Sequence, residues 1–180
     1  MNTIIKAITY ELESLVILTE IYQKNKQTNT SFHAVKIPKI SLRDYIARLR
    51  TYMKCSDECF VLALIYVKRL KSRVEDFRID LLSVHRLLLT GLTLATKFCE
   101  DEYSKNSYSA IVGGVSNKEL NQLELMFLTL LDFKLYVSKD YYSEYRKSLI
   151  KNYEEGESLD SFKQFGSGTY ILNQLQIKDT

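Results

Sequence analysis

The sequence predicts an all-α protein, and three observations carry that prediction. The 180 residues include one proline and six glycines, the residue types that interrupt helices most effectively. Apolar residues recur every three or four positions, and no segment alternates apolar and polar residues as a half-buried strand does. With 46% hydrophobic residues, the chain is long enough for one domain with a buried core and short for two.

The first predicted helix spans residues 3–22. Its apolar positions form one stripe, which we expect to dock on the rest of the protein: Ile4, Ile5, Ile8, Leu12, Leu15, Val16, Thr19 and Tyr22. A polar, aperiodic stretch over residues 25–36 reads as a linker that ends at Pro38. We therefore assign residues 1–35 to an N-terminal helix and a polar linker.

Two helices are predicted after the linker. Ser41 is the expected N-cap of the first, with Asp44 three residues later, and Ser56 is the candidate cap of the second. Residues 59–67 are apolar on nearly every side and could form a buried strand. The pattern continues to Ser72 without a breaker, which favours a helix enclosed by other helices.

A central helix is predicted over residues 83–99. Two of its sides are apolar, and a narrow polar line runs between them through Arg86, Thr90, Thr93 and Lys97. Apolar contact on two sides predicts a helix packed between neighbours. We expect its polar line to face water or a partner.

The remaining elements follow from caps and apolar stripes. "NSYSAIVGG" predicts a short helix that its two glycines end, and "SNKE" is a capping box that opens an amphipathic helix. Glu124 lies on the apolar stripe of that helix, where a carboxylate is costly unless it is paired. A last helix is expected over 139–151. We expect residues 151–180 to form a flexible tail in which "TYILNQLQI" could dock weakly.

The sequence gives little support for catalysis or for a bound cofactor. His33 and His85 have no nucleophile at a known motif spacing. Cys55 and Cys59 are four residues apart, but a structural zinc site needs four ligands, so two buried thiols are expected. The double glycine lacks the lysine of a phosphate-binding loop and reads as a turn. We therefore expect no enzyme, no metal and no cofactor.

Cysteine content and hydropathy predict an intracellular protein. An odd number of cysteines, three, and no secretory signal are typical of a reducing compartment, cytoplasm or nucleus. The longest apolar run is residues 59–67, whereas a membrane-spanning helix needs about 20 apolar residues. We expect a soluble protein that does not enter a membrane.

Three motifs, in order, resemble the cyclin family. "LALIYVKRL" (62–70) resembles the family's second-helix signature, and "LTLATKFCED" (92–101) resembles the third. "ELNQLELMFLTLLDFKLYV" (119–137) resembles the fifth helix, including a glutamate nine residues before a phenylalanine. "AIVGGVSNKELNQLE" and "ISLRDYIARL" are most similar to the P/U-type cyclins, the branch that contains the phosphate-pathway cyclins. The resemblance covers residues 36–150 and implies a five-helix cyclin box behind the leading N-terminal helix.

The resemblance implies a function in kinase regulation. Cyclins are the activating subunits of cyclin-dependent protein kinases, and Lys97 and Glu124 match the family residues that face the αC helix of the kinase. Thr90 and Thr93, on the same polar line, and Arg43 are further kinase-binding candidates. Lys97 and Glu124 could also pair with each other and offer their remaining hydrogen bonds outward. The alternative is a purely structural Lys–Glu pair.

Some positions depart from the family pattern. Lys68 stands where the second-helix signature has an aspartate. "LRDYI" (42–46) keeps only the arginine of the family's Met-Arg-Ala-Ile-Leu motif, so we do not expect the hydrophobic substrate-docking patch that accompanies it. The roughly 30 residues after 150 are too few for a second five-helix box, so a single-box cyclin is expected.

The alternative function is a transcription-type cyclin-fold module that binds nucleic acid or a scaffold protein without a kinase. Residues 28–75 carry ten Lys or Arg against four acids, and aromatic residues lie among these basic ones. This hypothesis predicts salt-dependent binding that weakens when Arg48 and Arg50 are reversed. The net charge of +3 is too small to favour nucleic acid by itself, so we prefer the kinase-activating subunit.

Overall fold

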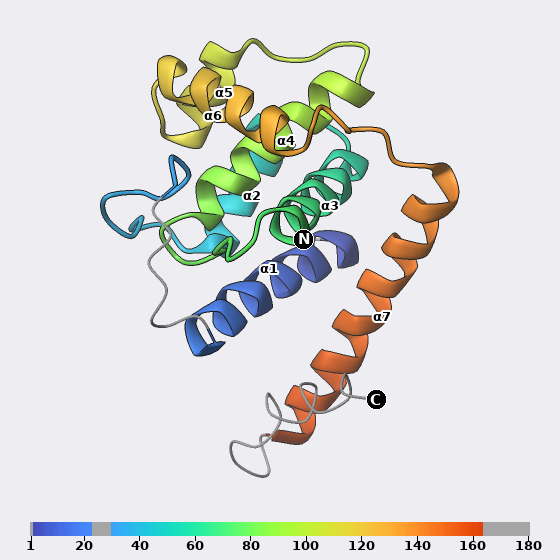
Figure 1. Ribbon diagram of the computed structural model, residues 1–180. Coiled ribbons are helices and arrows are strands. Elements are labelled where there is room, and N and C mark those ends of the chain that lie inside the picture. The colour runs from blue at the N-terminus through green and yellow to red at the C-terminus, as the bar shows by residue number, and fades with distance from the viewer. Residues whose placement is uncertain (1, 23–29, 164–180) are drawn as a thin grey trace.

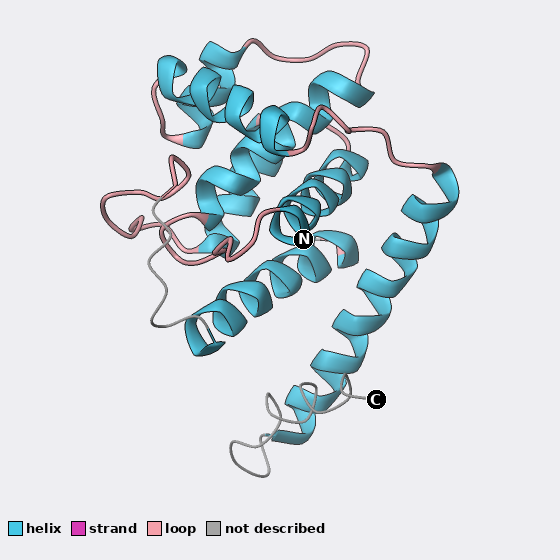
Figure 2. Ribbon diagram, viewed as in Figure 1, coloured by secondary structure: helices cyan, strands magenta, loops and turns pink. Residues whose placement is uncertain are grey.

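The computed structural model describes residues 2–22 and 30–163, and the regular structure of these residues is entirely helical (Figure 2). This confirms the predicted all-α class. The helices, in chain order, are α1 (Thr3–Tyr22), α2 (Leu42–Tyr52), α3 (Asp57–Arg73), α4 (Val84–Cys99), α5 (Asn106–Gly113), α6 (Asn117–Leu130) and α7 (Lys139–Lys163).

Helices α3 and α4 form the centre of the molecule (Figure 1). Residues 59–67 of α3 are all buried, as expected for a helix that other helices enclose, and the alternative of a buried strand is wrong. Gly91 lets α4 approach closely, because a Cβ atom there would lie 3.2 Å from the carbonyl oxygen of Ala63 in α3. Helices α2, α5 and α6 pack on α4, and α1 packs on α3.

Two of the predicted helix caps are confirmed. The Ser41 side chain accepts a hydrogen bond from the Asp44 N–H, and the Ser116 side chain accepts one from the Glu119 N–H. The Glu119 side chain is the second member of the expected capping box, but its carboxylate accepts a hydrogen bond from Arg86 of α4 at 2.7 Å. An ion pair between helices thus replaces a contact within α6.

The expected polar linker is partly anchored in the core. Phe32 is fully buried, and its ring meets the rings of Phe77 and Phe127 edge-on at centroid distances of 6.2 and 5.7 Å. His33 lies 3.5 Å from the Asp80 carboxylate. Residues 30–34 are therefore part of the folded unit, because a single aromatic residue in a polar stretch is enough to attach it.

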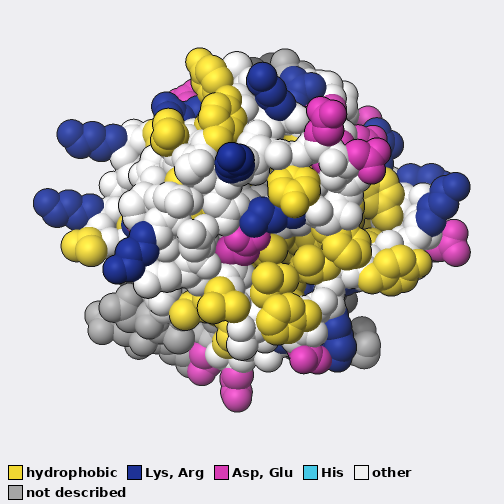
Figure 3. All heavy atoms as spheres, turned by 90° about the horizontal axis from the view of Figure 1, so that it is seen from above, with side chains coloured by type: hydrophobic (Ala, Val, Ile, Leu, Met, Phe, Trp, Pro, Cys, Tyr) yellow, Lys and Arg dark blue, Asp and Glu magenta, His cyan; other side chains and the backbone are white. Residues whose placement is uncertain are grey.

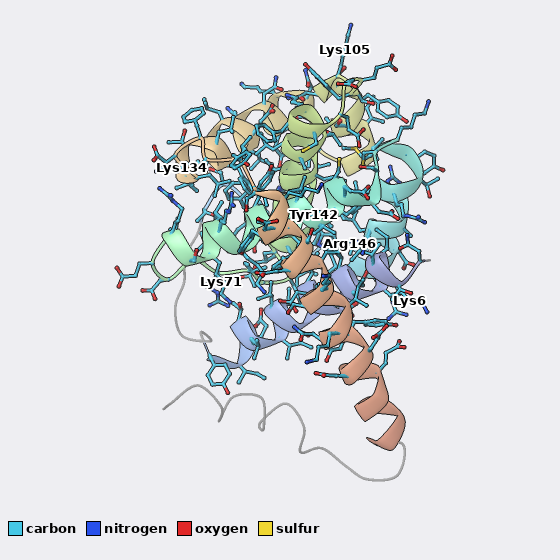
Figure 4. All side chains as sticks on the ribbon, turned by 90° about the vertical axis from the view of Figure 1, so that its right-hand side faces the viewer. Lys6, Lys71, Lys105, Lys134, Tyr142 and Arg146 are labelled. Atoms are coloured by element: carbon cyan, nitrogen blue, oxygen red, sulfur yellow. The ribbon has the colours of Figure 1, made fainter. Side chains whose placement is uncertain are left out.

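The prediction that the last helix ends near residue 151 is wrong. Helix α7 continues to Lys163 and packs along α1, and in a side view it crosses in front of α1 (Figure 4). Tyr153 is buried there and meets the Tyr10 ring edge-on at 5.9 Å. The face of α1 supplies the apolar partner that the local sequence lacks. The remaining tail, 164–180, with "TYILNQLQI", lies outside the described residues.

Hydropathy along the helices gives one further result. None of the helices in the described ranges is both long enough and apolar enough to span a bilayer.

Candidate functional site

Lys97 and Glu124 lie together at the junction of α4 and α6. Lys97 is in the last turn of α4, and its Nζ lies 2.6 Å from Oε1 of Glu124 on α6. The two side chains are 29% and 14% exposed, so the pair is at the edge of the core and still reaches solvent. The predicted pairing of these residues is confirmed.

Asn106 at the start of α5 completes this polar cluster. Its Nδ2 donates to Oε2 of Glu124 at 2.6 Å and to Oδ1 of Asn121 at 2.7 Å. Both carboxylate oxygens of Glu124 are therefore bound, and the carboxylate is fixed in position by two other helices. Lys97 has three N–H donors and uses one of them for Glu124, which leaves donors for a partner. The sequence carried no signal for Asn106, an ordinary residue at a helix start.

The expectation that the whole polar line of α4 faces outward is wrong. Thr90 and Thr93 are 0% and 1% exposed, and their hydroxyls donate to the carbonyl oxygens of Arg86 and Leu89 in the same helix. A threonine can satisfy its hydroxyl within its own helix and so be buried at little cost. In this structure neither threonine can touch a partner, so their predicted role as kinase contacts has no support.

Arg43 is exposed but lies elsewhere. It lines a groove of about 460 Å³ between α1 and α7, together with Lys6, Glu13 and Tyr153. The structure therefore does not bring Arg43 together with Lys97 and Glu124.

Exposed hydrophobic side chains lie next to Lys97 and Glu124 in the sequence and in the segment that follows α6. Phe98 and Leu125, the next residues in the chain, are 50% and 62% exposed, and Phe133 and Tyr136 are 64% and 74% exposed. We call these six residues the α4–α6 face: Lys97, Phe98, Glu124, Leu125, Phe133 and Tyr136. Seen from above, hydrophobic side chains gather into a broad patch next to charged ones (Figure 3). Such a patch is typical of a protein-binding surface.

Part of this face is hollowed. Phe98, Phe133 and Tyr136 line a hollow of about 720 Å³, and Arg69 and Arg73 of α3 lie along another side of it. A helix or loop of a partner could place an apolar side chain in a hollow of this size.

The turn that carries Phe133 is held in an uncommon conformation. Asp132 and Phe133 both have positive φ angles, 54° and 55°, which non-glycine residues rarely adopt. Arg69 donates hydrogen bonds to the carbonyl oxygens of Lys134 and Tyr136 at 3.1 and 3.0 Å and so fixes the turn. A residue keeps such a conformation when the surrounding structure holds it there, and in this turn the result is that the Phe133 side chain stays at the surface.

Two of the basic residues behind the nucleic-acid hypothesis make contacts within the protein. The Arg48 guanidinium donates to the carbonyl oxygen of Val112 at 2.7 Å, and Arg50 pairs with Asp57 at 3.0 Å. These contacts join α2 to its neighbours. Arg48 and Arg50, the residues whose reversal tests the nucleic-acid hypothesis, therefore also have a structural role.

Comparison with known proteins identifies the family. The family model described as "Cyclin" matches residues 7–135, and this chain belongs to the cyclin family. It is 35% identical to cyclin-U1-1 of Arabidopsis thaliana over 89% of this chain and 78% of that relative. It is 40% identical to cyclin-U4-1 of Arabidopsis thaliana over 74% of this chain, and 41% identical to cyclin-P3-1 of Oryza sativa subsp. japonica over 71% of this chain.

These relatives agree with the branch that the sequence motifs resemble. They are U-type and P-type cyclins, and the predicted P/U-type resemblance is confirmed. The chain spans 66% of the length of cyclin-U4-1 and 54% of cyclin-P3-1. Membership of this family indicates a regulatory subunit with a protein partner.

Proposed function

We propose that this chain is the regulatory subunit of a cyclin-dependent protein kinase and activates it by holding its αC helix in the active position. The observation that carries the proposal is the α4–α6 face, where a fixed and partly exposed Lys97–Glu124 pair lies among exposed aromatic side chains. Cyclin family membership supports a kinase as the partner. An intracellular location, as the unpaired cysteines predict, belongs to the same proposal.

The proposed mechanism is a shift between two conformations of the kinase. A protein kinase is active only when a glutamate of αC pairs with the active-site lysine. A subunit that binds only the inward position of αC shifts the equilibrium by its difference in affinity for the two positions. Almost complete switching from a mostly inactive kinase needs a difference of about 5.5 kcal/mol.

Apolar contacts are the best source of that free energy. A surface ion pair contributes up to about 1 kcal/mol. At about 25 cal/mol per Å² of buried apolar area, 5.5 kcal/mol corresponds to roughly 220 Å². An aromatic side chain buries about 150–250 Å², so the exposed parts of Phe98, Phe133 and Tyr136 together offer an apolar area of this size. Lys97 and Glu124 then set the register of the partner.

A charge reversal tests this assignment. In the double variant Lys97→Glu, Glu124→Lys the two side chains still attract each other, and the Asn106 amide can rotate to present its oxygen. The fold is therefore preserved while the charges that a partner meets are exchanged. The matched control is Lys151→Glu, Glu155→Lys, an exposed pair 3.7 Å apart on α7.

The readout is capture of a kinase. Tagged wild-type protein, the reversal and the control are used as bait in extracts of the source cells, and bound proteins are identified by mass spectrometry. We expect wild type and control to retain a cyclin-dependent kinase, and the folded reversal to lose it. A kinase that persists through the reversal, or wild-type protein that captures none, would show that the assignment is wrong.

A further inference from the structure

The hollow in the α4–α6 face is lined by basic as well as aromatic side chains. Arg69 and Arg73 of α3 and Lys134, which follows the turn at Phe133, all line it. Among the described residues that line it there is no aspartate or glutamate. The same hollow therefore offers an apolar surface and positive charge to whatever enters it.

One carboxylate lies beside these cations. Asp132 Oδ2 lies 2.7 Å from Nζ of Lys134 and 3.8 Å from Nη2 of Arg73. The three side chains are well exposed, and a single carboxylate cannot neutralise both cations. With Arg69 included, three cations and one carboxylate leave the hollow positively charged.

Arg69 is held in place as a donor. Its Nη1 donates to the carbonyl oxygens of both Lys134 and Tyr136, which fixes the plane of the guanidinium. Its Nε and Nη2 donate to no atom of the described residues, so further donors are available. A guanidinium that is already fixed loses little conformational freedom when it binds a carboxylate, which makes it a good carboxylate receptor.

We propose that this hollow selects a partner helix that carries an apolar side chain and, one turn away on the same face, an aspartate or glutamate. The apolar side chain packs on the aromatic rings, and the carboxylate meets Arg73 and the free donors of Arg69. Residues three or four apart on a helix lie about 5–6 Å from each other, so both can enter a hollow of about 720 Å³. That the helix belongs to a kinase rests on the proposed function, whereas the preference for a carboxylate does not.

Charge provides selectivity here, and apolar contact provides affinity. A partner helix with lysine or arginine at the acidic position would bring a like charge to the three cations and be rejected. The cations are exposed, so salt should screen this discrimination while it leaves the apolar contact in place.

Helical peptides test the preference without a kinase. Three alanine-rich peptides of about 15 residues carry one leucine and, four positions later, glutamate, glutamine or lysine. Each is titrated into the full chain labelled with nitrogen-15, and the backbone amide shifts of residues 133–136 are followed. We expect the glutamate peptide to bind about fivefold more tightly than the glutamine peptide, and the lysine peptide to bind most weakly. About 0.5 M NaCl should remove most of the difference.

Matched variants locate the charge. The variant Arg73→Gln, Lys134→Gln removes two cations from the hollow, and the control Lys71→Gln, Lys151→Gln removes two that do not line it. In a side view Lys71 lies well apart from Lys134 (Figure 4). Arg69 stays unchanged because it fixes the turn. The preference for glutamate should disappear in the first variant and persist in the control.

Several results would overturn the proposal. These are the absence of shifts at residues 133–136 with every peptide, equal affinity for the glutamate and lysine peptides, or an unchanged preference in Arg73→Gln, Lys134→Gln. A fourth peptide carries phosphoserine at the acidic position, and binding of that peptide alone would mean that the partner is phosphorylated instead.

Binding of the captured kinase is scored separately with the same variants. We expect Arg73→Gln, Lys134→Gln to weaken it about fivefold and the control to leave it unchanged. If the peptides behave as expected while no kinase is captured, the proposed function fails and the selectivity of the hollow stands. If the kinase binds both variants as tightly as wild type, the kinase does not use the hollow, and the Lys97–Glu124 reversal alone decides the proposed function.

Discussion

His85 shows at the residue scale how burial sets the chemistry of one side chain. Its ring is buried at the start of α4, meets the Tyr45 ring edge-on at 4.9 Å, and places Nε2 3.2 Å from the carbonyl oxygen of Ile40. Burial lowers the pKa of His85 below its ordinary value, and Arg86 lowers it further, while the Ile40 carbonyl opposes both. The folded protein therefore favours neutral His85.

This lowered pKa predicts a stability that depends on pH. Between the folded pKa and about 6.5, the unfolded chain binds a proton at His85 that the folded chain does not. The contribution of His85 to the free energy of unfolding is thus highest above pH 6.5 and falls as pH decreases through this window. An NMR titration should give a pKa below 6.5 for His85, and His85→Gln should flatten the dependence. A pKa at or above 6.5 would contradict the burial seen here.

Single residues also show where sequence reasoning succeeds. A carboxylate on an apolar stripe and a lysine at the end of a central helix were enough to predict the Lys97–Glu124 pair, because both are costly unless paired. The burial of Thr90 and Thr93 could not be predicted, since polarity on a helix surface does not mean exposure when the helix itself accepts the hydrogen bond.

At the scale of elements, α1 and α7 depend on each other. The capping residues and apolar stripes that define α2 to α6 lie in or beside the helices themselves, so the sequence places these helices correctly. The extent of α7 could not be read locally, because what stabilises it beyond residue 151 is the face of α1, more than 100 residues away in sequence. Lys68 of α3 adds to this contact, lying over the Tyr145 ring at 5.5 Å and pairing with Glu11.

The docking of α7 on α1 predicts a cost for removing one aromatic ring. Tyr153→Ala should lower the free energy of unfolding by about 3 kcal/mol, because it deletes a buried ring at the contact. Tyr136→Ala, at a position 74% exposed, should change it by less than about 0.5 kcal/mol. Denaturant unfolding compares the two. Equal, small effects would mean that α7 does not pack on α1 in solution.

At the scale of the whole molecule, α1 belongs to the same core as the helices of the box. Its buried residues, including Ile5, Ile8 and Leu12, join one continuous hydrophobic cluster with residues of α2 to α7. The sequence predicted a stripe that docks but not its target, because an apolar stripe does not specify its partner. The expected division into a leading segment, residues 1–35, and a box, residues 36–150, therefore does not describe two separate cores.

A shared core predicts cooperative unfolding of the intact chain. Thermal unfolding followed by circular dichroism and by tyrosine fluorescence should give one coincident transition. Deletion of residues 1–29 should leave a chain that aggregates or lacks a cooperative transition, since it exposes the surface that α1 covers. If the shortened chain unfolded cooperatively at the wild-type temperature, α1 would be an accessory to the fold.

Kinase activation tests the central claim most directly. The captured kinase is purified, and its rate of peptide phosphorylation is measured while it is titrated with wild-type protein, Phe98→Ser or Tyr22→Ser. Tyr22, 57% exposed on α1, is the matched control for Phe98, 50% exposed on the α4–α6 face. We predict that wild type and Tyr22→Ser activate equally and that Phe98→Ser needs about a tenfold higher concentration, since 1.4 kcal/mol of lost apolar contact is tenfold in affinity. Equal activation by all three proteins would contradict the claim that the α4–α6 face binds the kinase.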